Sequence, residues 1–156
     1  MRNGKNFSEG RIKGFFNIQI KEKKSGKIVG DSGWCRNTLT NNGLNAIAAI
    51  AIGATGSYAV GFAAIGKGTD SIVAGDTGLT SVQNKYLAVD PSSVATGTAR
   101  CTVSFDGSDN SATLTIGEIG LFSSAGAGAM LAGNTFTTSQ MTTDQTLNAT
   151  YELRFS

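Results

Sequence analysis

The sequence predicts a mainly β, single-domain protein, an antiparallel β-sandwich or jelly-roll-like fold with one short buried helix near residues 41–52. Apolar and polar residues alternate in several short segments, most clearly between Leu147 and Phe155, as they do in half-buried strands. Turn-forming residues separate these segments, and glycine alone supplies 21 of the 156 residues. Charged residues make up only 15% of the chain, which is typical of a protein that covers part of its surface in an assembly.

The N-terminal part predicts an arm followed by a hairpin. Residues 1–10 are polar and are expected to form an extended arm, so that the sandwich domain comprises residues 11–156. Phenylalanine and isoleucine alternate with polar residues over 11–21, which predicts a strand. Gly26 favours a turn, and residues 27–37 are expected to return as the partner strand.

An apolar helix is expected next. Thr40 or Asn41 is the candidate N-cap, and Gly53 is the expected stop. The side chains between them are apolar nearly all round, so the helix is expected to be buried against a sheet.

Short strands are expected along the rest of the chain. Pro91 is expected to break the chain, and the glycines at 117 and 120 predict a β-bulge or a close backbone approach. The expected strands cover residues 58–66, 79–89 (short or irregular), 94–105, 112–122, 129–137 and 147–155.

Three residues are assigned structural roles. Glu118 is the one acid within an apolar strand, and a buried carboxylate must be hydrogen-bonded or paired. Its expected partners are loop amides or a basic residue such as Arg100. Trp34 is expected in the core, and Tyr151 lies on the apolar side of the last strand.

The two cysteines, Cys35 and Cys101, both fall in predicted strands. They are expected to be buried thiols, with a disulfide as the alternative.

The basic residues gather at the start of the chain. Most of the 13 Lys and Arg residues precede Asn37, in a protein of net charge +2. They predict either a solvated hairpin or an arm that docks on an acidic partner. Nucleic acid is not favoured, because only Phe15 and Phe16 lie nearby for stacking. The candidate partner-binding residues are Arg2, Lys5, Arg11, Lys13, Lys23 and Lys24.

No pattern in the sequence predicts an enzyme, a cofactor or a metal site. The chain contains no histidine, and no nucleophile–base pair can be assembled from it. Gly66–Thr69 lacks the spacing of a phosphate-binding loop, and Asp70, Asp76 and Asp90 match no calcium loop. No apolar segment is long enough to span a membrane and no signal peptide is visible, so the protein is expected to be made and kept in the cytoplasm, or to assemble there into something larger.

Six short motifs follow one another along the chain: Asn37–Leu44 (NTLTNNGL), Ala64–Thr69 (AIGKGT), Asp76–Leu79 (DTGL), Glu118–Phe122 (EIGLF), Met130–Leu131 (ML) and Tyr151–Phe155 (YELRF). In this order they resemble a pattern shared by many virion structural proteins of tailed bacteriophages. The resemblance extends over nearly the whole chain, from about residue 12 to residue 155. The chain departs from the pattern after Asp76–Leu79. Proteins with this pattern often have an arginine there, and in this chain Lys85 is the candidate to take its role.

The resemblance implies a non-enzymatic protein of the virion. Its expected partners are phage capsid or tail subunits and further copies of itself in a homo-oligomer. No membrane partner is expected. The preferred function is a capsid decoration or cement protein that bridges and stabilises capsid subunits. A tail, collar or baseplate adaptor for fibre attachment is the first alternative. A carbohydrate-binding module for host recognition is an alternative of another class. It is disfavoured because only Trp34, Tyr58 and Tyr86 are aromatic candidates for such a site, and Trp34 is expected in the core.

Overall fold

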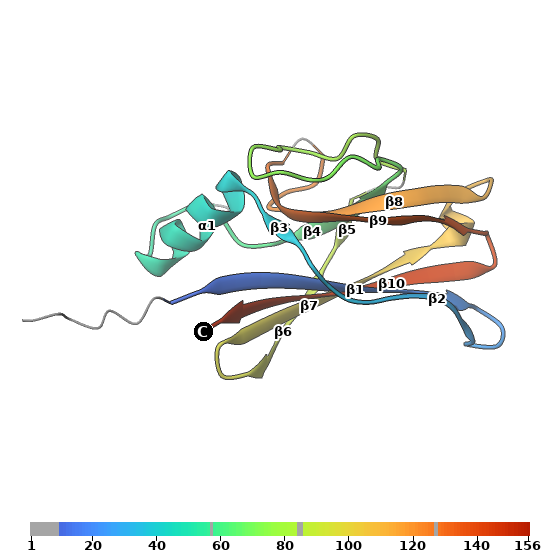
Figure 1. Cartoon of the computed structure of the whole chain (residues 1–156), viewed down its shortest axis with the longest axis horizontal. Helices are drawn as coiled ribbons and strands as arrows, with labels where there is room; N and C mark the ends of the chain where they lie inside the picture. Colours follow the sequence, from blue (N-terminus) through green and yellow to red (C-terminus); the bar gives the residue numbers. More distant parts are fainter. Residues whose placement is uncertain (1–9, 57, 84–85, 127) are drawn as a thin grey trace, which may run out of the picture.

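The protein is a β-sandwich with a helix at one end, as seen in a computed structural model that describes residues 10–56, 58–83, 86–126 and 128–156. Two five-stranded antiparallel sheets pack face to face, which confirms the predicted fold class (Figure 1). The expected arm, apart from its last residue, and Lys85 lie outside the described residues.

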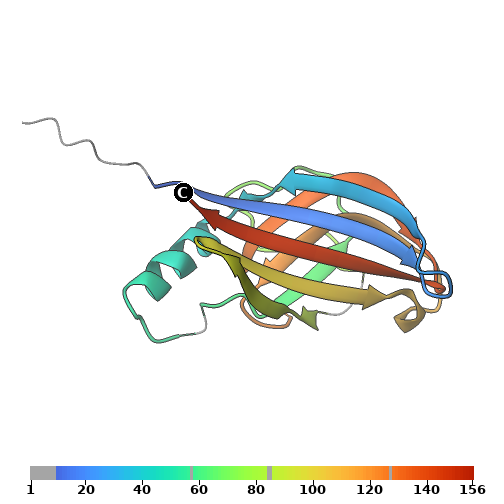
Figure 2. The same cartoon turned by 90° about the horizontal axis from the view of Figure 1, so that it is seen from below.

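Each sheet combines strands that follow one another in the sequence with strands from distant parts of the chain. Sheet A contains, in spatial order, β2 (Ile28–Arg36), β1 (Ile12–Glu22), β10 (Gln145–Phe155), β7 (Thr98–Asp106) and β6 (Asp90–Ala95) (Figure 2). Sheet B contains β3 (Thr38–Leu39), β9 (Met130–Met141), β8 (Leu114–Phe122), β4 (Phe62–Gly66) and β5 (Leu87–Ala88). The helix α1 spans Asn41–Ala51, and a 3-10 turn spans Gly107–Asp109.

The main core lies between the two sheets. Alternate residues of β1 point inward, and Phe16, Ile18 and Ile20 are all buried. Phe105 of β7 and Leu147 of β10 meet them there, and both are fully buried. The period-two pattern of the sequence therefore identifies the inner face of sheet A correctly.

The strands β8 and β4 of sheet B are buried on both faces. A second apolar cluster lies on the outer side of this sheet, where Phe122 and Met130 pack with Ile72 and Leu79 of the long connection after β4. This connection covers the sheet in Figure 1 (green, above β8 and β9). The double cover explains why every residue of β8 from Ile116 to Phe122 is buried.

Two predictions around Pro91 are wrong. Pro91 does not break the chain but lies within β6, an edge strand of sheet A, where a missing backbone N–H can face solvent. The segment expected as a single strand over 94–105 is a hairpin instead. Gly97, with φ of +71°, makes the turn that separates β6 from β7.

Candidate functional site

Helix α1 is held at one end of the sandwich by its first turn. Thr40 is the N-cap: its hydroxyl accepts a hydrogen bond from Gly43 N at 3.1 Å and donates to the Met130 carbonyl at 2.5 Å. Gly43 lies directly against the backbone carbonyl of Leu131, where no Cβ atom would fit. The start of the helix is therefore fixed to β9, as Figures 1 and 2 show.

The expectation that this helix is buried is wrong. Only Gly43 and Ala46 of the helix are buried. Leu44 is 46% exposed, and Ile52, the C-cap residue, is 81% exposed. With the exposed Ala48 between them, these residues follow the i, i+4, i+8 spacing of a single helix face. We call Leu44, Ala48 and Ile52 the α1 patch.

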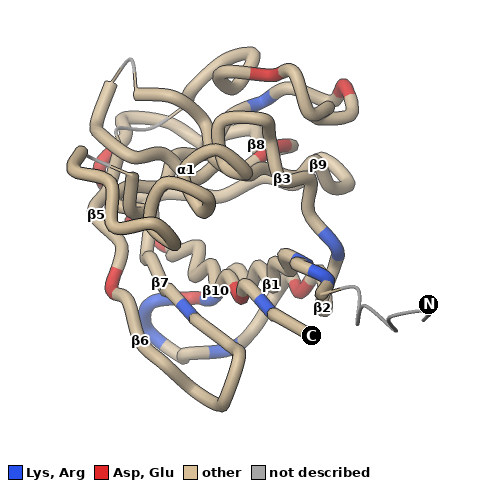
Figure 3. Tube along the Cα trace, turned by 90° about the vertical axis from the view of Figure 1, so that its left-hand side faces the viewer, with Lys and Arg blue, Asp and Glu red and all other residues tan. Residues whose placement is uncertain are grey.

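The α1 patch lies in a part of the chain without charge. No Lys, Arg, Asp or Glu occurs between Arg36 and Lys67, and Figure 3 shows α1 without a charged position. Exposed apolar surface without charges is typical of contact sites between proteins. The helix sequence is apolar on nearly all sides, and this pattern is the same for a helix buried in its own domain and for one whose exposed face binds a partner. The sequence alone could therefore not distinguish the two.

A small apolar cavity lies beneath the other face of α1. It has a volume of about 100 Å³, and its lining includes Ile47, Ile50 and Tyr58 together with Tyr151 and Leu153 of β10. Tyr151 is 5% exposed, and its ring lies 5.0 Å from that of Phe16. Burial raises the pKa of the Tyr151 phenol above its ordinary range.

Glu118 fastens the long connection to sheet B. Its carboxylate accepts hydrogen bonds from Gly68 N at 3.0 Å, Ser81 N at 3.2 Å and Thr80 N at 3.3 Å. Of the two kinds of partner that the sequence left open, the structure therefore shows loop amides. Arg100 lies on sheet A and binds another acid, Glu152.

Glu152 joins two arginines on the outer face of sheet A. The carboxylate accepts from Arg154 Nε at 2.8 Å and from Arg100 Nε at 3.0 Å, and forms an ion pair with each. Burial of Glu152 acts to raise its pKa, but the hydrogen bonds from Arg100 and Arg154 outweigh this and hold the pKa below its ordinary value.

This arrangement predicts a pH-dependent contribution to stability. Because the folded-state pKa of Glu152 is lowered, its stabilisation is fully present above the unfolded value of about 4.5 and is lost as the pH falls through the folded value. We expect Glu152→Gln to lower the free energy of unfolding by about 1 kcal/mol at pH 7. Urea unfolding from pH 7 to pH 3 should show this difference shrinking, and a difference that stays constant with pH would contradict the assignment.

Trp34 is 48% exposed, not part of the core. It pairs with Asn17 across β1 and β2, and both side chains point away from sheet B. A register shift just before it, at Ser32 and Gly33, adds one residue to β2 and reverses the side on which the following residues lie. Gly33 has φ of +62°, a conformation that favours glycine.

The candidate basic residues do not form one patch. Arg11 exchanges backbone hydrogen bonds with Ser156, and Lys13 lies on β1. Lys23 and Lys24 lie just after the opposite end of that strand. Lys23 forms an ion pair with Asp106, and hydrogen bonds from Lys23 and Ser108 lower the pKa of Asp106 to about 2. Arg2 and Lys5 lie outside the described residues.

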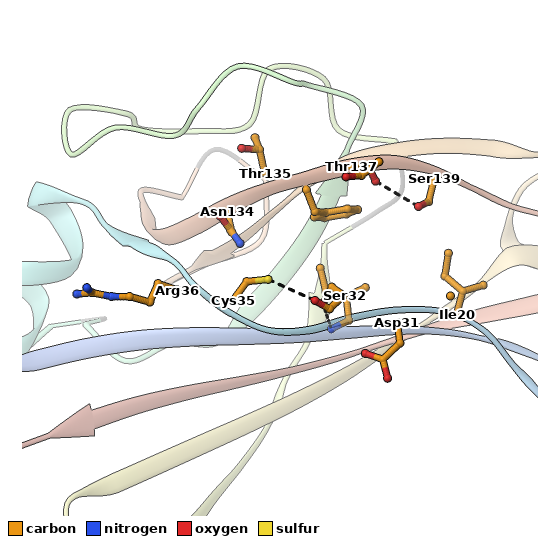
Figure 4. Close-up of a pocket in the computed structure, with 12 residues that line it drawn as sticks. Ile20, Asp31, Ser32, Cys35, Arg36, Asn134, Thr135, Thr137 and Ser139 are labelled. Carbon is orange, nitrogen blue, oxygen red and sulfur yellow. Dashed lines mark hydrogen bonds between the residues drawn. The ribbon is translucent and has the colours of Figure 1, made fainter.

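A cleft of about 500 Å³ opens between β2 and β9 on one flank of the sandwich (Figure 4). Cys35 lies in it, and its thiol donates to the Ser32 carbonyl at 3.4 Å. Cys101 is buried in the core, where burial raises the pKa of its thiol to about 12. Both thiols are free, so the alternative of a disulfide is not what the structure shows.

The described residues contain no group of three or more His, Cys, Asp or Glu side chains that could hold a metal ion. Within the same ranges, no helix has the length and apolarity needed to cross a membrane. Comparison of the chain with protein-family models, curated proteins and solved structures finds no match. We take the α1 patch as the candidate functional site, because its apolar side chains are exposed in a part of the chain without charge.

Proposed function

We propose that the protein is a structural component of a tailed-phage virion, a capsid decoration or cement protein whose copies bind one another through the α1 patch. The observation that carries the proposal is the exposed, charge-free face of α1, in which Leu44 and Ile52 remain open to water. The series of phage-like motifs supplies the virion context. A rigid sandwich with an apolar face at one end suits a subunit that acts by binding.

The proposed occupant of the α1 patch is a second copy of this chain. Because the patch has no charge, two copies can meet across a symmetric contact without like-charge repulsion. Ala48 adds a small side chain at the centre of the strip, which allows a partner to approach closely. Such contacts favour the assembled state over the free subunit by mass action.

The contact predicts that charges on α1 weaken self-association. We expect Leu44→Glu to raise the dimer dissociation constant at least tenfold, because it removes apolar burial on both sides of a symmetric contact. Ile28→Glu is the matched control, since Ile28 is 45% exposed and lies near the β1–β2 turn, away from α1 (Figure 1). Analytical ultracentrifugation across a concentration series measures the dimer dissociation constant of each variant. Equal dissociation constants for the two variants would refute the α1 contact.

The place of the protein in the virion is tested by its copy number. Quantitative mass spectrometry of purified particles of the encoding phage compares this chain with the major capsid protein. Hundreds of copies in a fixed ratio to capsid subunits would support decoration or cement. About a dozen copies would favour the tail, collar or baseplate adaptor, and absence from the particle would overturn the virion proposal.

A further inference from the structure

The outer face of sheet A carries ordered rows of polar side chains. The strand register places Trp34, Asn17, Thr150 and Thr102 side by side across four strands. The adjacent row is made by Asp31, Gln19, Asn148 and Ser104. Figure 2 shows the five strands of this sheet running side by side. Amides and hydroxyls therefore dominate the middle of the face.

A hollow of about 280 Å³ lies over the middle of these rows. Its lining includes the amides of Asn17, Gln19 and Asn148, with hydroxyls from the neighbouring strands. Lys21 and Asp90 add one charge of each sign. The volume is close to the lower limit for small-ligand sites, and the lining offers both donors and acceptors.

Asp31 holds two of these amides in place. Its carboxylate accepts from Gln19 Nε2 at 2.8 Å and from Asn17 Nδ2 at 3.1 Å, and it also accepts from Gly33 N at 2.8 Å. Each of the two amides thus has an N–H anchored to Asp31 and still carries a carbonyl oxygen that can accept a hydrogen bond. The polar groups of the hollow are therefore arranged before any ligand arrives.

Trp34 stands at the margin of the hollow as a supported aromatic surface. The guanidinium of Arg154 lies 5.6 Å from the centre of its ring and 4.3 Å from that of Phe15. Glu152 in turn fixes Arg154. Because the Trp34 indole is half exposed, it contributes little apolar burial to folding. Its fixed position suits the binding of a flat, partly apolar ligand.

We propose that this face is a saccharide-binding site, with the hollow for the hydroxyl groups of one sugar and Trp34 as the stacking surface for the C–H face of the next. A sugar ring is polar at its edge and apolar on its faces, and this surface offers the matching groups side by side. Nucleic acid fits less well, because Glu152 already engages Arg100 and Arg154, and Asp90 offsets Lys21. The site is independent of the α1 contact.

The chain provides its own probe, because Trp34 is its single tryptophan. The full-length protein is first applied to an array of neutral and uronic-acid-containing bacterial surface oligosaccharides. The hit is then titrated while the intrinsic fluorescence is followed. We expect at least one class of oligosaccharide to bind and to change the Trp34 emission. No binding above background anywhere on the array would overturn the proposal.

The site is then located by variants measured by calorimetry with the same oligosaccharide. We expect Trp34→Ala and Asn148→Ala each to weaken binding at least tenfold, and Trp34→Phe to retain most of it. Phe155→Ala is the matched control, because Phe155 is an exposed aromatic (46%) outside these rows. All variants are checked for an unchanged thermal midpoint. Equal affinity for wild type and Trp34→Ala would refute the assignment, whatever the copy number in virions.

Discussion

Replacing Glu118 by alanine is expected to lower the free energy of unfolding by about 3 kcal/mol or more. The substitution removes the acceptor from three backbone amides, those of Gly68, Thr80 and Ser81, at a site where Glu118 itself is only 2% exposed. Each buried donor left without a partner costs about 1–3 kcal/mol. Chemical denaturation measures the loss.

The variant should also loosen the cover of sheet B. Ile72 and Leu79 pack in the second apolar cluster, and they lie on the connection that Glu118 ties down at Gly68 and at residues 80–81. We expect limited proteolysis to cut this connection faster in Glu118→Ala. Glu118→Gln, which keeps one acceptor oxygen, should give an intermediate loss, and Glu22→Ala in the hairpin should change stability by less than about 1 kcal/mol. A Glu118→Ala protein as stable as the wild type would show that the amides find other acceptors.

Gly43→Ala is expected to have the second largest effect, a loss of about 2–3 kcal/mol. A Cβ at this position would collide with the backbone carbonyl of Leu131, and a backbone atom of β9 cannot move aside without disturbing the sheet. The variant should therefore tilt or detach α1, and it should weaken self-association together with stability. Thermal unfolding and ultracentrifugation of the same samples measure the two effects.

A second glycine provides the control for this substitution. A Cβ at Gly78 would meet nothing within 4 Å. Gly78→Ala should therefore be neutral or slightly stabilising, because it restricts the unfolded chain. If Gly43→Ala matched it, the close approach of α1 to β9 would be disproved.

The phage-like motifs acquire a common physical explanation from sheet B. Added Cβ atoms at Gly66 and Gly68 would meet the Glu118 carboxylate, which links the motif at 64–69 to that at 118–122. Met130 N donates to the Thr77 carbonyl, and the Thr40 hydroxyl donates to the Met130 carbonyl. These two bonds link the motifs at 37–44, 76–79 and 130–131. Five of the six motifs thus meet around sheet B, whereas the motif at 151–155 lies on β10 of sheet A, and their residues serve the fold more directly than an activity.

The sequence predicted the strands well where alternation was regular and failed where a single residue decided the outcome. The strands around Phe16 and Leu147 follow the period of two, and their inner faces are those expected. Gly97 divides one apparent strand into a hairpin, which composition does not reveal. Trp34 was assigned to the core because the pattern of β2 gives no sign of the one extra residue before it, which turns its side chain outward.

The exposure of α1 and the partners of Glu118 were harder to predict than the fold, because each depends on which distant part of the chain packs against the residue. Helix α1 was placed correctly from its cap and its stop, yet its exposure depends on how little of the sandwich end faces it. Glu118 was recognisable as a buried acid from its apolar neighbours alone. The loops that bind it are distant in sequence, so its partners could be named only as a class.

The central position of β10 in sheet A has a consequence for the order of folding. Strands β1 and β7 have no contact with each other in the sheet except through β10, which pairs with both along nearly its whole length. During synthesis on the ribosome, β10 is the last of these elements to emerge. Until then, of the strand pairs of sheet A, only β1–β2 and β6–β7 can form, and the pairings with β10 that join them are missing. The earlier segments must therefore wait in an incomplete state, and closure of the domain follows translation of its last strand.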